Sequence, residues 1–153
     1  MACNKYKNRN YKSALQYFNT TAQAVAATDL AVNPVIIDLG ATVTDTGAAF
    51  DFKGRSFDVC YSGLYAFETD ITIDGTAAGD VTFAIVLDGV VLPETVRTIT
   101  QVADVEKVVH LSTVRQLKTC CSISEHNVYL IAYSDGTGTG TIVQVSGNAI
   151  KEA

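Results

Sequence analysis

Two histidines are the residues of this sequence best suited to catalysis. His110 lies in VVHLSTV, residues 108–114, and His126 directly precedes NVYLIAY, residues 127–133. A hydrolytic triad needs a serine at a sharp strand-to-helix turn, and a zinc site needs histidines at helical spacing. Neither pattern accompanies these histidines, so we expect no catalytic residue and predict that the chain is not an enzyme.

Three aspartates, Asp70, Asp74 and Asp80, could hold calcium through oxygen ligands if the fold gathered them at one end. The alternative, which we favour, is that they are solvated loop carboxylates. The GTGTG run at residues 136–140 lacks the G-x-G-x-x-G spacing of a phosphate loop, and a strand pattern follows it where a helix is needed. We therefore predict a hairpin loop there, and neither a metal nor a cofactor.

Four cysteines, Cys3, Cys60, Cys120 and Cys121, lack the C-x-x-C spacing of a zinc ribbon and the framework of a small secreted domain. The N-terminus is basic, but no apolar segment of a secretory signal follows it. We therefore expect synthesis in a cytoplasm and four reduced thiols, with a soft-metal site as the alternative.

The elements that position these residues have an apolar period of two, which is typical of β-strands. Residues 13–27 are ambiguous, because their alanines allow a helix, but the β-branched neighbours favour an extended segment. Asp74-Gly75, Asp88-Gly89 and Asp135-Gly136 predict chain reversals. The predicted strands are Val35 to Leu39, Ala48 to Phe52, Ser56 to Cys60, Leu64 to Ile73, Val81 to Leu87, Val96 to Val102, Val105 to Val114, Asn127 to Tyr133 and Thr141 to Ile150.

Length and charge limit the class of protein. A chain of 153 residues suits one domain with its own core. Its 11 basic residues face 16 acidic ones, and four of the basic residues fall within the first twelve positions, before any acid. The remaining body is strongly acidic and would repel a phosphate backbone, which argues against nucleic acid as a partner. No run of 18 apolar residues predicts a membrane helix.

Several predicted strands have more apolar surface than one core can use. In residues 64–73, one face is apolar throughout, while the other changes from Leu64 and Ala66 to Glu68 and Asp70. Both faces of residues 81–87 and 128–133 are apolar. A two-sheet sandwich buries one face of each strand, so the second face predicts contact with another copy of the chain.

These blocks resemble a known family. YSGLYAF at residues 61–67, VTFAIVLDG, VVHLSTV, NVYLIAYSDG and TIVQVSGNAI are similar to the globular-head jelly roll of complement heads, tumour necrosis factor-like ligands and many bacterial and bacteriophage surface proteins. FNTTAQAVAA, residues 18–27, resembles the first strand of the bacterial and phage members. The resemblance implies an all-β, ten-stranded jelly-roll sandwich that packs as a homotrimer, with inner-sheet strands around the threefold axis.

On this basis we predict a trimeric jelly-roll domain over residues 17–153 and a short extended basic arm over residues 1–16. The expected trimer-interface residues are Tyr65, Tyr129, Ile131, Tyr133, Val143 and Val145. The arm cannot build a core of its own, and its basic and aromatic residues are predicted to anchor the domain to a particle. These anchoring residues are Lys5, Tyr6, Lys7, Arg9, Tyr11 and Lys12.

The functional hypothesis is a structural virion protein, namely a bacteriophage head-fibre, capsid-decoration or tail-associated homotrimer, located on the virion. Its partners would be itself and, through the arm, a capsid or other virion protein, with no membrane involved. The alternative is a trimeric module that binds a receptor or host glycan on a phage or bacterial surface.

Overall fold

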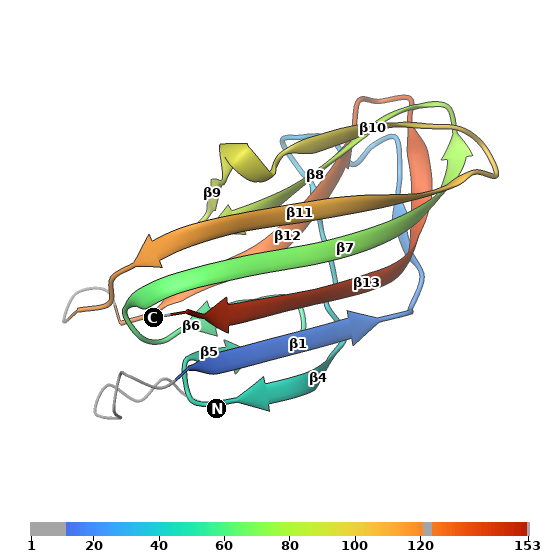
Figure 1. The fold of residues 1–153 in the computed structure, drawn as a ribbon. Helices are drawn as coiled ribbons and strands as arrows, with labels where there is room; N and C mark the ends of the chain where they lie inside the picture. Colours follow the sequence, from blue (N-terminus) through green and yellow to red (C-terminus); the bar gives the residue numbers. More distant parts are fainter. Residues whose placement is uncertain (1–11, 121–123, 153) are drawn as a thin grey trace.

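The computed structural model describes residues 12–120 and 124–152, which form two antiparallel β-sheets packed face to face (Figure 1). The sheet that we call the β7 sheet has the strand order β11 (Glu106–Leu117), β7 (Gly63–Ala77), β13 (Thr139–Lys151), β1 (Ser13–Asn19) and β4 (Ala41–Thr46), and β2 (Gln23–Val25) pairs with β13. The β8 sheet has the order β10 (Arg97–Gln101), β8 (Gly79–Leu87), β12 (His126–Ser134), β6 (Phe57–Val59) and β5 (Phe50–Phe52). In the β8 sheet, β3 (Val35–Ile36) pairs with β12, and β9 (Val90–Val91) pairs with β8.

The predicted all-β fold is confirmed, and each predicted strand has a counterpart. Residues 13–27 form β1 and β2, so the extended interpretation of this segment is correct. The only helical element among the described residues is the short 3-10 helix η1, Pro93–Thr95. No helix in that part of the chain is long and apolar enough to cross a membrane.

An aromatic cluster fills the space between the two sheets. Tyr65 and Phe67, the alternate residues of the GLYAF motif on β7, stack with ring centroids 6.2 Å apart. Phe50 packs edge-on against Tyr65 at 5.7 Å, and Phe57 lies 5.8 Å from Phe67. The Tyr65 hydroxyl donates a 2.6 Å hydrogen bond to the Tyr61 carbonyl, which satisfies its one polar atom inside the core.

Two of the three predicted reversals are present. Asp88 and Gly89 have φ of 51° and 80° between β8 and β9, and Gly136 has φ of 100° between β12 and β13. The third prediction is wrong, because β7 runs straight through Asp74-Gly75. A Cβ on Gly75 would lie 2.2 Å from the Val102 carbonyl oxygen, so this glycine allows the β10–β11 loop to approach the strand closely.

The predicted domain boundary at residues 16 and 17 falls inside a strand. β1 begins at Ser13, which pairs with Lys151 of β13, and Ala14 pairs with Thr46 of β4. The residues from Ser13 to Gln16 therefore belong to the β7 sheet. The start of β1 is hard to predict from the sequence because the basic residues continue up to Lys12, immediately before the strand.

Candidate assembly face

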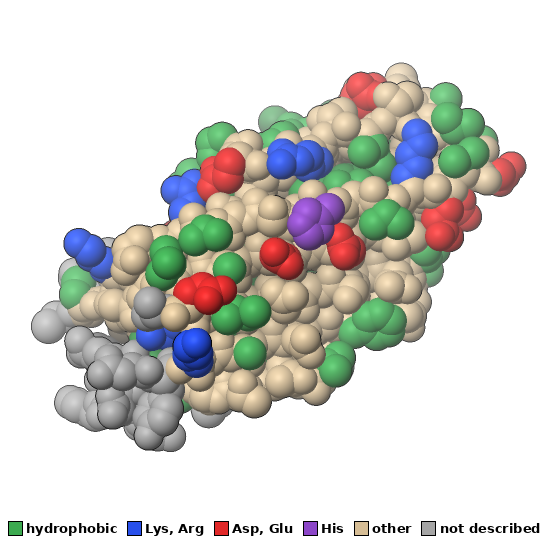
Figure 2. All heavy atoms as spheres, in the orientation of Figure 1, with side chains coloured by type: hydrophobic (Ala, Val, Ile, Leu, Met, Phe, Trp, Pro, Cys, Tyr) green, Lys and Arg blue, Asp and Glu red, His purple; other side chains and the backbone are tan. Residues whose placement is uncertain are grey.

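The outward side of the β7 sheet is the candidate functional surface, and we call it the outer face. Strand geometry turns alternate residues away from the core. On β11, for example, Val109 and Leu111 are buried, whereas Val108 and Val114 are 65% and 60% exposed. Figure 2 views the molecule from this side, where apolar and acidic side chains lie close together.

An apolar row crosses four strands of the outer face. Val114 of β11 pairs with Ala66 of β7, Ala66 pairs with Ile150 of β13, and Ile150 pairs with Ala14 of β1. Residues paired across neighbouring strands have side chains within contact distance, so these four form one continuous strip. No strand or loop of the described chain covers Val114, which is why the strip is available to a partner.

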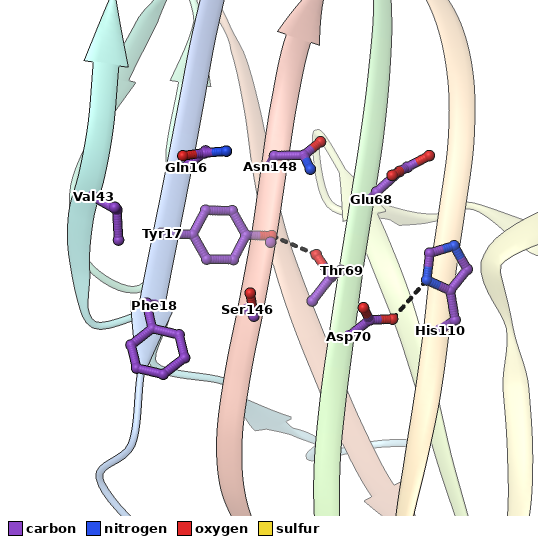
Figure 3. Close-up of a pocket in the computed structure, with 11 residues that line it drawn as sticks. Gln16, Tyr17, Phe18, Val43, Glu68, Thr69, Asp70, His110, Ser146 and Asn148 are labelled. Atoms are coloured by element: carbon purple, nitrogen blue, oxygen red, sulfur yellow. Dashed lines mark hydrogen bonds and ion pairs between the residues drawn. The ribbon is translucent and has the colours of Figure 1, made fainter.

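Beside this strip lies a shallow hollow of about 330 Å³ (Figure 3). One row of its lining contains Glu68, Asn148 and Gln16, and the next contains His110, Asp70, Ser146 and Phe18. The remaining lining residues are Tyr17, Val43, Thr69 and Gly147.

The charged groups of the hollow are mostly acidic. Glu68 and Asp70 are exposed carboxylates, and no lysine or arginine lines the hollow. The His110 Nδ1 atom lies 2.7 Å from Asp70 Oδ1, and both side chains are more than half exposed. The described lining of the hollow therefore carries a net negative charge.

Tyr17 supports the hollow from the core side. Its ring crosses beneath Gly147, where an added Cβ would lie 2.3 Å from the ring, and its hydroxyl lies 2.5 Å from Thr69 Oγ1. Burial raises the pKa of Tyr17 to about 12, although the hydrogen bond with Thr69 acts in the opposite direction. The hydroxyl therefore stays neutral and links β1 to β7 across β13.

A second apolar surface lies on the opposite side of the molecule, on the outward side of the β8 sheet. Ala84, Val86 and Ile131 are buried there, with Tyr129 and Tyr133 packed against them and partly exposed. Val96 also packs onto this cluster. The apolar second faces of residues 81–87 and 128–133 are therefore accounted for in large part within a single chain.

The six predicted interface residues do not lie on one surface. Tyr65 and Val145 are fully buried between the sheets and have no surface to offer a second chain. Tyr129, Ile131 and Tyr133 lie on the outward side of the β8 sheet. Val143 is half-buried at a register irregularity of β13, between Ile142 and Gln144.

The two faces of β7 are separated as the sequence pattern predicted, and Tyr65, one of the predicted interface residues, lies on the buried face. Leu64, Ala66, Glu68 and Asp70, the face that changes from apolar to acidic, point outward as one set. Tyr65 points inward. A large aromatic side chain is typical of the core face of a strand, so selecting the largest side chain selected the buried face. The exposed valines of β11 were missed, although their period-two spacing carried the signal.

The predicted anchoring residues lie almost entirely outside the described part of the chain. The structure does not describe five of them: Lys5, Tyr6, Lys7, Arg9 and Tyr11. Lys12 is described and is exposed, one residue before β1. The anchoring role remains a proposal.

The two histidines have structural partners. His126 Nδ1 lies 2.6 Å from Asp88 Oδ2, and its Nε2 lies 2.8 Å from the Lys118 carbonyl oxygen. Burial alone would lower the pKa of His126, but these two hydrogen bonds outweigh it and raise the pKa above its usual value. The contact with Asp88 and the 2.8 Å bond from the Asn127 amide to Asp88 Oδ1 tie β12 to the β8–β9 turn, and the contact with Lys118 ties it to the segment after β11.

Among residues 12–120 and 124–152, no group of three or more His, Cys, Asp or Glu side chains is placed to hold a metal ion. Asp70 instead pairs with His110, and Asp80 accepts a hydrogen bond from Thr100 Oγ1 at 2.8 Å. Within the GTGTG run, the Asp135 carboxylate accepts hydrogen bonds from the backbone amides of Thr137 and Gly138. The loop between β12 and β13 is thereby closed on itself, as a hairpin loop should be.

One cysteine differs from our expectation. Cys60 is nearly buried and disulfide-bonded, and its partner is not among the described residues. The prediction of four reduced thiols is therefore wrong at this position. A disulfide depends on which cysteines the fold brings within reach, and spacing along the sequence does not report this.

Comparison with solved structures places the fold. The globular domain of zebrafish complement 1qA protein matches with a TM-score of 0.58 and 14% identity, over 89% of this chain and 94% of that one. Murine APRIL matches with a TM-score of 0.64 and 11% identity, over 92% and 99%. PRD1 vertex protein P5 matches with a TM-score of 0.59 and 15% identity, over 91% and 96%. No protein-family model and no curated protein matches the sequence.

The chain therefore has the jelly-roll fold of the complement-head and tumour necrosis factor-like globular heads, as the resemblance implied. At these identities the similarity concerns the fold alone. None of the three matched structures is named as an enzyme.

Proposed function

We propose that the chain is a non-enzymatic structural module of a virus particle, which assembles as a homotrimer through the outer face of the β7 sheet. The observation that carries the proposal is the apolar strip from Val114 to Ala14, in which Val114 and Ile150 are exposed and the two alanines are half-buried. An apolar strip across four strands costs free energy in water, and a second copy of the chain would remove it from water.

The fold supports a threefold arrangement. Heads of this jelly-roll kind pack as trimers with one of their two sheets, the inner sheet, around the axis. In this chain the four strands that carry the strip all belong to the β7 sheet, which would take the place of the inner sheet. One of the similar structures is a phage vertex protein, which supports a location on a virion. Within that location, a bacteriophage head fibre, a capsid decoration and a tail-associated protein are the roles we propose.

The arm completes the proposal. Its basic residues precede an acidic body, so an acidic particle surface would attract the arm and repel the domain. Such a division of charge suits an anchor that holds a displayed head. Tyr6 and Tyr11 would add contacts that salt does not screen.

Co-sedimentation with purified particles of the virus tests the anchoring role. A shortened chain that begins at Lys12 should remain folded and trimeric but lose attachment. Replacing Lys5, Lys7 and Arg9 by serine should weaken attachment most at low salt, whereas replacing Tyr6 and Tyr11 by alanine should weaken it at every salt concentration. Undiminished attachment of the shortened chain would contradict the anchor and favour the alternative, a receptor- or glycan-binding module, which a glycan array would then test.

A further inference from the structure

The hollow on the outer face is the feature that the proposed trimer leaves unexplained. Glu68 and Asp70 stand beside the apolar strip, on the same strand as Ala66. If the outer face forms the trimer interface, three copies of both carboxylates approach one another near the axis. Like charges that meet in a partly desolvated interface destabilise it.

Among the residues that the structure describes, no basic side chain lines the hollow beside these carboxylates. On β13, the residues that pair with Glu68 and Asp70 are Asn148 and Ser146, both uncharged. On β1, the next residues in these rows are Gln16 and Phe18. Protonation is therefore the means by which the described residues of the hollow would relieve the repulsion.

His110 is the group placed to take up such a proton. Its Nδ1 lies 2.7 Å from Asp70 Oδ1 in the single chain, so a protonated ring would donate directly to that carboxylate. The outward neighbours of His110 on its own strand are Val108 and Ser112, which are uncharged.

The remaining charged groups near β11 have other partners. Glu94 of η1 binds Thr113 and Arg115, and Lys107 donates to the Thr100 carbonyl. Glu106 lies opposite Asp74 in the strand register at the far end of β11, and neither residue lines the hollow. These two acids add negative charge to the face and would favour proton uptake further.

We infer that assembly of this chain is controlled by pH, and that the hollow of Glu68, Asp70 and His110 is the control element. Mildly acidic conditions protonate His110 and reduce the repulsion between carboxylates, so they strengthen the trimer. Neutral and basic conditions weaken it. The inference rests on the proposed assembly through the outer face and adds its regulation.

Linkage sets the size of the effect. Histidine is the side chain whose charge ordinarily changes within the pH range in which the effect should appear. Uptake of one proton per chain on assembly would change the trimer association constant by up to about a thousandfold per pH unit, because three chains contribute. Partial uptake would still give a change of about tenfold or more.

The test is analytical ultracentrifugation of the full chain from about pH 5.5 to about pH 8, a range that spans the histidine titration. The wild-type association constant should fall as pH rises. A double variant, Glu68→Gln with Asp70→Asn, should form a stronger trimer whose constant is nearly independent of pH. His110→Gln should remove most of the pH dependence while it keeps the trimer weak.

Asp104→Asn is the matched control. It removes one carboxylate from the β10–β11 loop, outside the hollow lining, and asparagine suits the positive φ of 61° at this position. The control should behave as wild type, and thermal unfolding of every variant should show that each still folds. A wild-type trimer with a constant association constant over the pH range would overturn the inference alone. A chain that is monomeric at every pH would contradict the proposed assembly and the inference together.

Discussion

At the scale of single residues, the contact between Tyr17 and Gly147 shows how one missing side chain allows a link between strands. The Tyr17 ring occupies the space where a Cβ of residue 147 would lie, and this position lets the hydroxyl reach Thr69. Gly147 has no positive φ, so its importance is steric rather than conformational.

We predict that Gly147→Ala lowers the free energy of unfolding by about 1 to 3 kcal/mol, because the new methyl group displaces a buried ring. Tyr17→Phe, which removes only the hydrogen bond, should cost about 1 kcal/mol. Urea denaturation measures both. In a Tyr17→Ala background the cost of Gly147→Ala should nearly vanish, and an unchanged cost in that background would show that the ring is not the cause.

His126 gives a pH dependence whose sign can be worked out. Its pKa is raised in the folded chain, so its contribution to stability is fully present below the unfolded pKa and is lost as pH rises through the folded pKa. The difference in unfolding free energy between wild type and His126→Gln should therefore be larger at about pH 5.5 than at about pH 8.5. A difference that grows with pH would contradict the hydrogen bonds to Asp88 and Lys118.

At the scale of elements, most strands could be predicted because their apolar residues repeat every second position. β4 was missed because nearly all its side chains are exposed, which leaves no apolar period to detect. Asp74-Gly75 was interpreted as a turn because the dipeptide commonly forms one, but here the glycine accommodates a neighbouring loop. Local sequence does not distinguish these two uses of glycine.

β1 provides the test at this scale. It pairs with β13 over seven residues and with β4 on its other side, so it is an interior strand of the sheet. We predict that a chain beginning at Lys12 keeps the wild-type melting temperature within a few degrees, whereas one beginning at Phe18 fails to fold cooperatively. Circular dichroism during heating compares the two. Cooperative unfolding of the shorter chain near the wild-type temperature would contradict the placement of β1.

At the scale of the whole molecule, the fold class could be predicted, but which of the predicted interface residues share a surface could not. The family resemblance and the apolar second faces both indicated a partner copy. Which strands share a sheet is decided by long-range pairing, and this pairing separates Tyr129 and Tyr133 from β13. Tyr65 and Val145 illustrate the same limit, because a strand pattern does not say which of its two faces meets the core.

The two apolar surfaces of the molecule differ in how far they are satisfied. The cluster around Ile131 on the β8 sheet is closed over in part by its own tyrosines, whereas Val114 and Val108 have no such cover in the described chain. This difference is our reason for placing the threefold contact on the β7 sheet.

The most direct test of this account is the mass in solution of wild type, Val114→Asp and Val90→Asp, measured by sedimentation at about pH 5.5, where the proposed control favours assembly. Val114 and Val90 are 60% and 66% exposed, on the β7 and β8 sheets respectively, so the two substitutions are closely matched. We predict that wild type and Val90→Asp are trimers and that Val114→Asp is a folded monomer, because a carboxylate in the strip would be desolvated on assembly. A monomeric wild type, or a Val114→Asp variant that remains a trimer, would contradict assembly through the outer face.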